Sequence, residues 1–88
     1  MKVILGGALT EGAPQREFQL AFEGGTTREG LLAALAGEVP AIARYQRASA
    51  ETGKPVALMI ITGGNWIHPG DAIAEDAEVE IYPPISGG

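Results

Sequence analysis

The sequence closes with Glu78-Val79-Glu80-Ile81-Tyr82-Pro83-Pro84-Ile85-Ser86-Gly87-Gly88, in which a strand pattern meets an abrupt stop. Residues 78–82 alternate between polar and apolar side chains, so Val79 and Ile81 share one face of a half-buried strand. Pro83 has no N–H to donate to a sheet, and it ends the strand. We therefore predict a strand over residues 78–82 and an extended tail over residues 83–88.

Three earlier segments also have strand patterns. Residues 2–5 are mostly apolar, and Gly6-Gly7 ends them. Residues 17–22 alternate, and they form a hairpin with the first strand across the turn at residues 10–16. Residues 56–62 are apolar on both faces, which is typical of a central strand.

A main helix is expected between the second and third of these strands. Thr26 and Glu29 have the spacing of a capping box, in which each side chain binds the other residue's free backbone N–H. Leucines then recur at helical spacing, and Gly37 stands at a position typical of a helix end. We predict a helix over residues 27–36.

A second, short helix is expected to open at a proline, which suits the first helical turn. In this helix Ile42 and Tyr45 point inward, while Arg44 and Arg47 point outward.

The order strand, strand, helix, short helix, strand, turn, strand indicates an α+β fold. A mixed sheet with one main helix packed across it is the β-grasp, or ubiquitin-like, arrangement. A chain of 88 residues supports one modest core, so we expect a single β-grasp domain over residues 1–82, followed by the tail. Trp66, Ile67 and Ile73 are expected to add to that core.

Charge and composition exclude several classes of function. The chain has 11 acidic and 6 basic residues, a net charge of −5, which argues against nucleic acid or an anionic membrane as a partner. It has no Cys, and hence no disulfide, thiolate metal site or cysteine nucleophile. The longest apolar run, residues 56–61, is far too short to span a membrane, and the N-terminal stretch is too short for a signal peptide. We expect a cytoplasmic protein.

The remaining polar residues do not assemble into a catalytic or metal site. His68 is the sole histidine and is interpreted as a turn residue. Asp71, Glu75 and Asp76 lack the spacing of a calcium loop and are interpreted as a solvated turn. The glycine pairs lack the lysine of a phosphate loop. We therefore expect no metal, no bound cofactor and no enzymatic activity of the chain alone.

The Gly87-Gly88 pair offers a chemistry that needs no cysteine. Glycines have no side chains, so this backbone fits a narrow channel, and the prolines hold the tail away from the sheet. The carboxylate of Gly88 is a poor electrophile, but adenylation by ATP gives it a leaving group. A persulfide or sulfide then displaces AMP and leaves a C-terminal thiocarboxylate, in the persulfide case after a thiol has reduced the sulfur–sulfur bond.

Residues 79–88 resemble the C-terminus of the MoaD/ThiS family of ubiquitin-like sulfur carriers. They are most similar to MoaD, the small subunit of molybdopterin synthase, in which a strand, two prolines and Ser/Thr-Gly-Gly recur. The resemblance implies that a MoeB/ThiF-type enzyme, using ATP and magnesium, adenylates Gly88, which then becomes a thiocarboxylate. It also implies that the tail enters a MoaE-like large subunit and delivers sulfur there for molybdenum cofactor biosynthesis.

The same resemblance implies roles for the rest of the tail. Gly87 keeps the tail slender, and the tail and partner-binding residues are Tyr82, Pro84, Ile85 and Ser86. Three alternatives stay open. The carrier serves thiamine, cysteine or tRNA thiolation; Gly88 is joined to lysines of other proteins, as in a protein modifier; or the chain is an interaction module with an inert tail.

Overall fold

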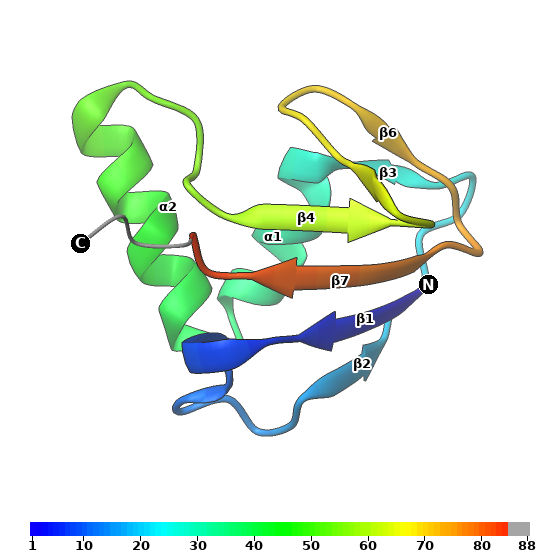
Figure 1. Ribbon diagram of the computed structural model, residues 1–88, viewed down its shortest axis with the longest axis horizontal. Coiled ribbons are helices and arrows are strands. Elements are labelled where there is room, and N and C mark those ends of the chain that lie inside the picture. Colours follow the sequence, from blue (N-terminus) through cyan, green and yellow to red (C-terminus); the bar gives the residue numbers. More distant parts are fainter. Residues whose placement is uncertain (85–88) are drawn as a thin grey trace.

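The computed structural model of the protein describes residues 1–84 (Figure 1). The helices are the 3₁₀ helix η1 (Gly7–Thr10), α1 (Arg28–Ala36) and α2 (Pro40–Thr52). The strands are β1 (Lys2–Leu5), β2 (Glu17–Gln19), β3 (Thr26–Thr27), β4 (Met59–Thr62), β5 (Asn65–Trp66), β6 (Ala72–Ile73) and β7 (Glu78–Tyr82). Within residues 1–84, they form a five-stranded sheet with the order β2-β1-β7-β4-β5 and a two-stranded sheet of β3 and β6.

The main sheet is mixed, as predicted. Strand β1 runs parallel to β7, with Val3 opposite Val79, and antiparallel to β2. Strand β4 runs antiparallel to β7, with Ile60 opposite Ile81. The middle strand is therefore β7, and β4, within the predicted central strand over residues 56–62, is an interior strand paired with β7 and β5. The apolar side chains of β4 divide between the core and a face of the sheet that neither α-helix of residues 1–84 covers, and the two-residue β5 lies beyond β4 in the sheet.

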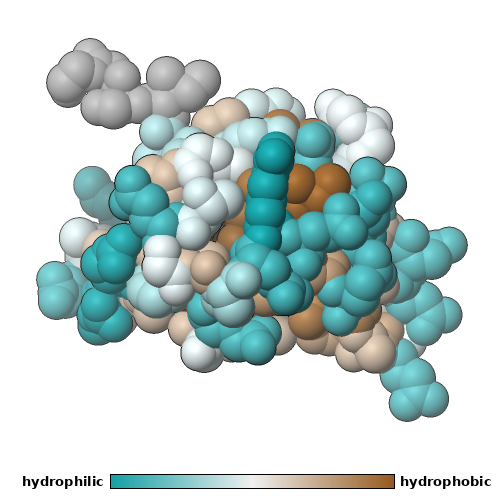
Figure 2. All heavy atoms as spheres, turned by 90° about the horizontal axis from the view of Figure 1, so that it is seen from below, coloured by the Kyte–Doolittle hydropathy of each residue, from teal (hydrophilic) through white to brown (hydrophobic). Residues whose placement is uncertain are grey.

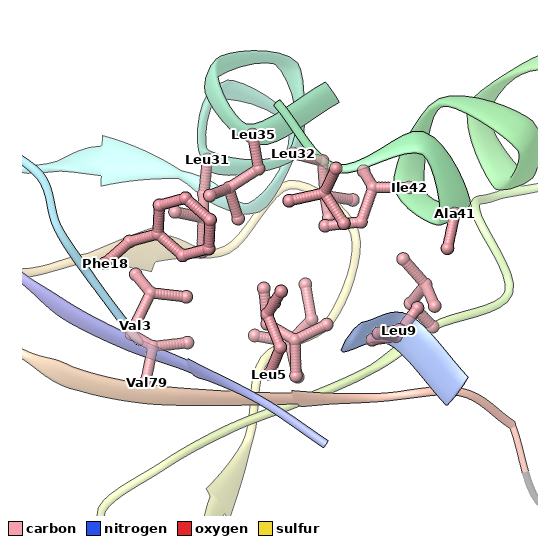
Figure 3. Close-up of a cluster of buried hydrophobic side chains, with 14 of the residues drawn as sticks. Val3, Leu5, Leu9, Phe18, Leu31, Leu32, Leu35, Ala41, Ile42 and Val79 are labelled. Atoms are coloured by element: carbon pink, nitrogen blue, oxygen red, sulfur yellow. The ribbon is translucent and has the colours of Figure 1, made fainter. Parts of the chain in front are cut away.

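Helix α1 packs across the other face of the sheet and closes the core (Figure 3). Val3 and Val79 point from β1 and β7 toward the leucines of α1. Near α2, Leu9 of η1 points toward Ala41. The fully buried side chains are Val3, Leu5, Leu9, Leu31, Leu32, Leu35, Val39, Ile42, Ile60, Val79 and Ile81. This is the predicted α+β, β-grasp arrangement.

The N-terminal cap of α1 lies one residue later than predicted. Thr26 belongs to β3, where it pairs with β6. The capping residue is Thr27, whose Oγ1 accepts a hydrogen bond from the N–H of Gly30 at 3.1 Å. Glu29 accepts instead from the N–H of Gly70, at 3.1 Å. The predicted capping box of Thr26 and Glu29 is wrong. Thr26 is paired in β3, and the residue three positions after the actual N-cap, Thr27, is Gly30, which has no side chain to bind the N–H of the cap.

Strand β2 is shorter than the predicted strand over residues 17–22. Pairing ends near Leu20, whose N–H donates to the carbonyl of Met1 at 2.9 Å. The chain then turns, and the N–H of Gly25 donates to the carbonyl of Phe22 at 2.9 Å. Gly25 has φ of 92°, a left-handed conformation that favours glycine, so the alternating pattern continues past the strand into a turn.

Strand β4 begins at Met59 rather than at residue 56, because a buried arginine binds the preceding backbone. Nη2 of Arg28 donates hydrogen bonds to the carbonyls of Val56 and Leu58 at 2.9 and 2.7 Å. Arg28 is 4% exposed, and its Nε has no hydrogen-bond partner in the described part of the chain. Burial lowers the pKa of this guanidinium, and the neighbouring Glu29 partly offsets the effect.

Helix α2 lies beyond the end of the sheet toward which β1 and β7 run (Figure 1). As predicted, Ile42 is buried and Tyr45 is half-buried, while Arg44 and Arg47 are exposed. The helix is longer than predicted and stops only at Gly53, which has φ of 72°.

Trp66 is not part of the core, contrary to prediction. Its side chain is 53% exposed on β5. It stands opposite Ile61 of β4, so it shares the face of the sheet that faces away from α1. Ile73 is buried and Ile67 is half-buried against the core, as predicted.

Candidate functional site

The candidate site is the segment Tyr82-Pro83-Pro84, where β7 ends and the tail begins, and we call this segment the tail root. Tyr82 is the last residue of β7 and is half-buried. Pro83 is also half-buried, and Pro84 is exposed. The other predicted site residues, Ile85, Ser86, Gly87 and Gly88, lie outside the described residues.

Two glycines after β1, Gly6 and Gly7, lie against Tyr82 and Pro83 of the tail root, and we call this glycine pair the seat. The N–H of Gly6 donates to the carbonyl of Ile81 at 2.8 Å, which continues the β1–β7 pairing. A Cβ on Gly6 would overlap the ring of Tyr82. At Gly7, which has φ of 56°, a Cβ would lie 3.3 Å from Cγ of Pro83. The absence of side chains at these positions lets the tail root lie directly on the backbone.

The hydroxyl of Tyr82 donates a hydrogen bond to Oε1 of Glu80 at 3.1 Å. This bond and the negative charge of Glu80 raise the pKa of Tyr82 above its ordinary value, and nearby Arg16 opposes the shift. Arg16 is itself held here, because its Nε donates to the carbonyl of Leu5 at 3.2 Å. The seat and the hydrogen bond together fix the ring of Tyr82 where the chain leaves the sheet.

An apolar strip lies next to the tail root on the uncovered face of the sheet. Strand pairing places its members on that face, because Ile61 is opposite both Glu80 and Trp66, and Met59 is opposite Tyr82. Ile4 of β1 is also opposite Glu80. We call this set the open-face strip, and it consists of Ile4, Met59, Ile61, Trp66 and Tyr82.

The strip is suited to bind a partner. Trp66 is the large hydrophobic side chain that is exposed within residues 1–84, and the others are half-buried. Apolar surface that is grouped in this way marks an interaction site more often than scattered single residues do. The face seen from the β2 edge is mixed, with hydrophilic side chains surrounding exposed hydrophobic atoms (Figure 2).

The remaining polar groups have structural roles. His68 and Asp71 share a turn, in which Oδ2 of Asp71 accepts a hydrogen bond from the backbone N–H of His68 at 2.8 Å. Within residues 1–84, no three His, Cys, Asp or Glu side chains are placed to hold a metal ion together. Neither α-helix in the same span has the length and apolar character needed to cross a membrane.

Sequence reasoning missed the residues that position the tail root. Glu80 could have been found, because the alternation of β7 places it on the same face as Tyr82. Gly6 could not, because its contact with Tyr82 depends on the parallel pairing of the two ends of the chain. The open-face strip is partly visible in the sequence as the outward side chains of the apolar segment around Met59 and Ile61.

Comparison with known proteins supports this fold over nearly the whole chain. The crystal structure of SAMP1 from Haloferax volcanii matches with a TM-score of 0.73 and 28% sequence identity, over 99% of this chain and 97% of that chain. A crystal structure of H. volcanii small archaeal modifier protein 1 matches with a TM-score of 0.72 and 26% identity, over 96% and 95%. No protein-family model and no curated protein sequence matches. The structural likeness confirms the ubiquitin-like β-grasp fold.

Proposed function

We propose that this chain is a ubiquitin-like sulfur carrier whose Gly88 carboxylate is adenylated and then converted to a thiocarboxylate. The observation that carries the proposal is the direct passage from the middle strand, β7, into Pro83-Pro84-Ile85-Ser86-Gly87-Gly88. Strands on both sides hold β7, so the tail root has a fixed position and direction. A carrier needs this arrangement in order to present a narrow segment to an enzyme.

The chemistry proceeds in two balanced steps. The carboxylate of Gly88 attacks the α-phosphate of ATP, which forms an acyl-adenylate and releases pyrophosphate. Hydrosulfide then attacks the acyl carbon, the bond to AMP breaks, and a thiocarboxylate, AMP and a proton are formed. The activating enzyme, of the MoeB/ThiF type, binds ATP and magnesium, and this chain supplies only the carboxylate and the surfaces that position it.

The open-face strip is proposed to bind the activating enzyme. The strip includes Tyr82, so a protein that encloses the tail reaches the strip without crossing the rest of the domain. Exposed Trp66 at its far end supplies a large apolar contact, and aromatic residues of this kind often dominate interface energies.

We further propose that the sulfur acceptor is a molybdopterin precursor held by a MoaE-like large subunit. The support for this proposal is the similarity of Tyr82-Pro83-Pro84-Ile85-Ser86-Gly87-Gly88 to the end of MoaD. The other acceptors, in thiamine, cysteine or tRNA thiolation, share every step up to the thiocarboxylate.

A second candidate function is that of a protein modifier. It is favoured by the likeness to H. volcanii small archaeal modifier protein 1. In this reaction a lysine amine attacks the same acyl-adenylate, AMP leaves, and an isopeptide bond forms. The two functions share the activation step and differ only in the nucleophile that follows.

Deletion of Gly88 tests the proposed function. We expect the variant to keep the far-ultraviolet circular dichroism and unfolding midpoint of the full chain, because the deleted residue follows the sheet. Sulfur transfer from a MoeB/ThiF-type enzyme, ATP and sulfide should be lost. Retained transfer would refute the carrier role. Lysine adducts in cell extract that disappear with Gly88, without any thiocarboxylate, would favour the modifier instead.

A further inference from the structure

A pocket lies between η1 and α2, directly beside the tail root. Its volume is about 260 Å³. Small-molecule sites usually measure roughly 300–1,000 Å³, so this pocket suits a protein side chain better than a cofactor. We call it the α2 groove, and its principal lining residues are Leu9, Ala41, Arg44, Tyr45, Ala48 and Pro83.

The α2 groove is continuous with the tail root. Pro83, which lies on Gly7 of the seat, also forms one wall of the groove. The opposite wall is one face of α2, where Ala41, Arg44 and Ala48 recur at helical spacing. A protein that closes around the tail therefore meets the open-face strip on one side of the root and the α2 groove on another.

The positive charge of Arg44 at the rim of the α2 groove favours a partner segment that carries a carboxylate. Arg44 is exposed at its rim, and the ion pairs of the described residues join Lys2 to Glu17 and His68 to Asp71, leaving Arg44 without a carboxylate partner. Glu11 lies at the η1 side of the same rim and is not among the ion pairs of residues 1–84. A guanidinium that has no carboxylate partner within residues 1–84, next to an apolar wall, is complementary to a segment with an aliphatic side chain and a nearby carboxylate.

We propose that the α2 groove is a second docking site for the adenylating enzyme, separate from the open-face strip. In this proposal, which rests on the proposed function, a segment of the enzyme places an aliphatic side chain against Ala41 and Ala48 and a carboxylate against Arg44. The groove thereby holds the enzyme on the helical side of the tail while the strip holds it on the sheet side.

Two matched pairs of variants test the proposal. Arg44→Glu and Arg47→Glu change the net charge equally on the same helix, but only Arg44 lines the groove. Ala48→Trp and Ala50→Trp enlarge two exposed residues of that helix, but only Ala48 lines the groove. The measurement is ATP–pyrophosphate exchange by a purified MoeB/ThiF-type enzyme, with the full chain as the varied substrate.

We expect Arg44→Glu and Ala48→Trp to raise KM for the chain about tenfold, equivalent to a loss of ~1.4 kcal/mol of binding, with little change in kcat. Arg47→Glu and Ala50→Trp should stay within about twofold of the unmodified chain. Equal effects within each pair would overturn the proposal, and so would a lower KM, which would mean that the chain's own tail occupies the groove. Failure of the unmodified chain to support exchange would contradict the proposed function instead.

Discussion

The ring of Tyr82 occupies the space that a side chain at residue 6 would fill. Gly6 follows the first strand and Tyr82 ends the last, and the parallel pairing of β1 with β7 brings them together. The first few residues of the domain therefore set where its tail begins. This contact links the fold directly to the proposed chemistry at Gly88.

Substitution of Gly6 should disturb this contact specifically. We expect Gly6→Ala to lower the free energy of unfolding by about 1–3 kcal/mol, because the added methyl group must displace the ring of Tyr82. Gly37→Ala is the matched control, since Gly37 has φ of −70° and no other atom of the described residues lies within 4 Å of the Cβ that alanine would add. Urea denaturation measures both variants.

A double-mutant cycle identifies the cause of that loss. In a Tyr82→Ala background, Gly6→Ala should cost less than about 0.5 kcal/mol, because the ring that it displaces is gone. An unchanged cost in that background would show that the strain lies elsewhere.

The titration of Tyr82 should depend on Glu80. The hydrogen bond and charge of Glu80 raise the pKa of Tyr82 above 10.0, so Glu80→Gln should lower it toward that value. Glu78→Gln, on the same face of β7, is the control and should change it little. Site-resolved ¹³C NMR of the tyrosine Cζ follows the titration, and equal shifts in the two variants would contradict the assignment to Glu80.

The same shift predicts how stability changes with pH. The folded chain holds the phenolic proton of Tyr82 more tightly than the unfolded chain does, because the pKa of Tyr82 is higher in the folded state. The contribution to stability is therefore fully present below the unfolded pKa and is lost as pH rises through the folded pKa. Glu80→Gln should flatten this alkaline loss in urea denaturation.

Arg28 should contribute strongly to stability. We expect Arg28→Met to lower the free energy of unfolding by about 2–4 kcal/mol, because the carbonyls of Val56 and Leu58 lose a charged donor. Arg47→Met removes an exposed arginine and should change stability by less than about 0.5 kcal/mol. Similar urea midpoints for the two variants would show that the two hydrogen bonds add little.

Trp66 should matter for binding rather than for folding. Trp66→Ala is expected to cost less than about 1 kcal/mol of stability, whereas Ile60→Ala, on the buried face of the same hairpin, should cost about 2–5 kcal/mol. The chain has a single tryptophan, so its fluorescence reports on the open-face strip. A blue shift on addition of the activating enzyme is expected, and an unchanged spectrum at saturation would exclude Trp66 from the interface.

Local patterns in the sequence predict most of the fold. The alternation around Val79 and Ile81 defines β7 correctly, and the leucine spacing defines α1. These predictions succeed because periodicity records which face of an element is buried. They also give the order of the elements, which indicates an α+β fold and resembles the β-grasp arrangement by analogy.

The errors arise where distant contacts override local preference. The pairing of β3 with β6 removes Thr26 from the cap of α1, and Arg28 takes the carbonyls that would have extended β4. Trp66 is exposed although its type is usually buried, because its pairing with Ile61 places it on the face of the sheet away from α1. The seat at Gly6 has no local signal, since a glycine pair after a strand is also typical of an ordinary turn.

Intact mass spectrometry of the full chain tests the central claim most directly. The chain is incubated with ATP, magnesium, sulfide and a MoeB/ThiF-type enzyme, and a chain that lacks Gly88 serves as the control. The account predicts a mass gain equal to the replacement of one oxygen by one sulfur, confined to the C-terminal peptide and absent from the control. An unchanged mass, with an enzyme that thiocarboxylates its own carrier under the same conditions, would contradict it.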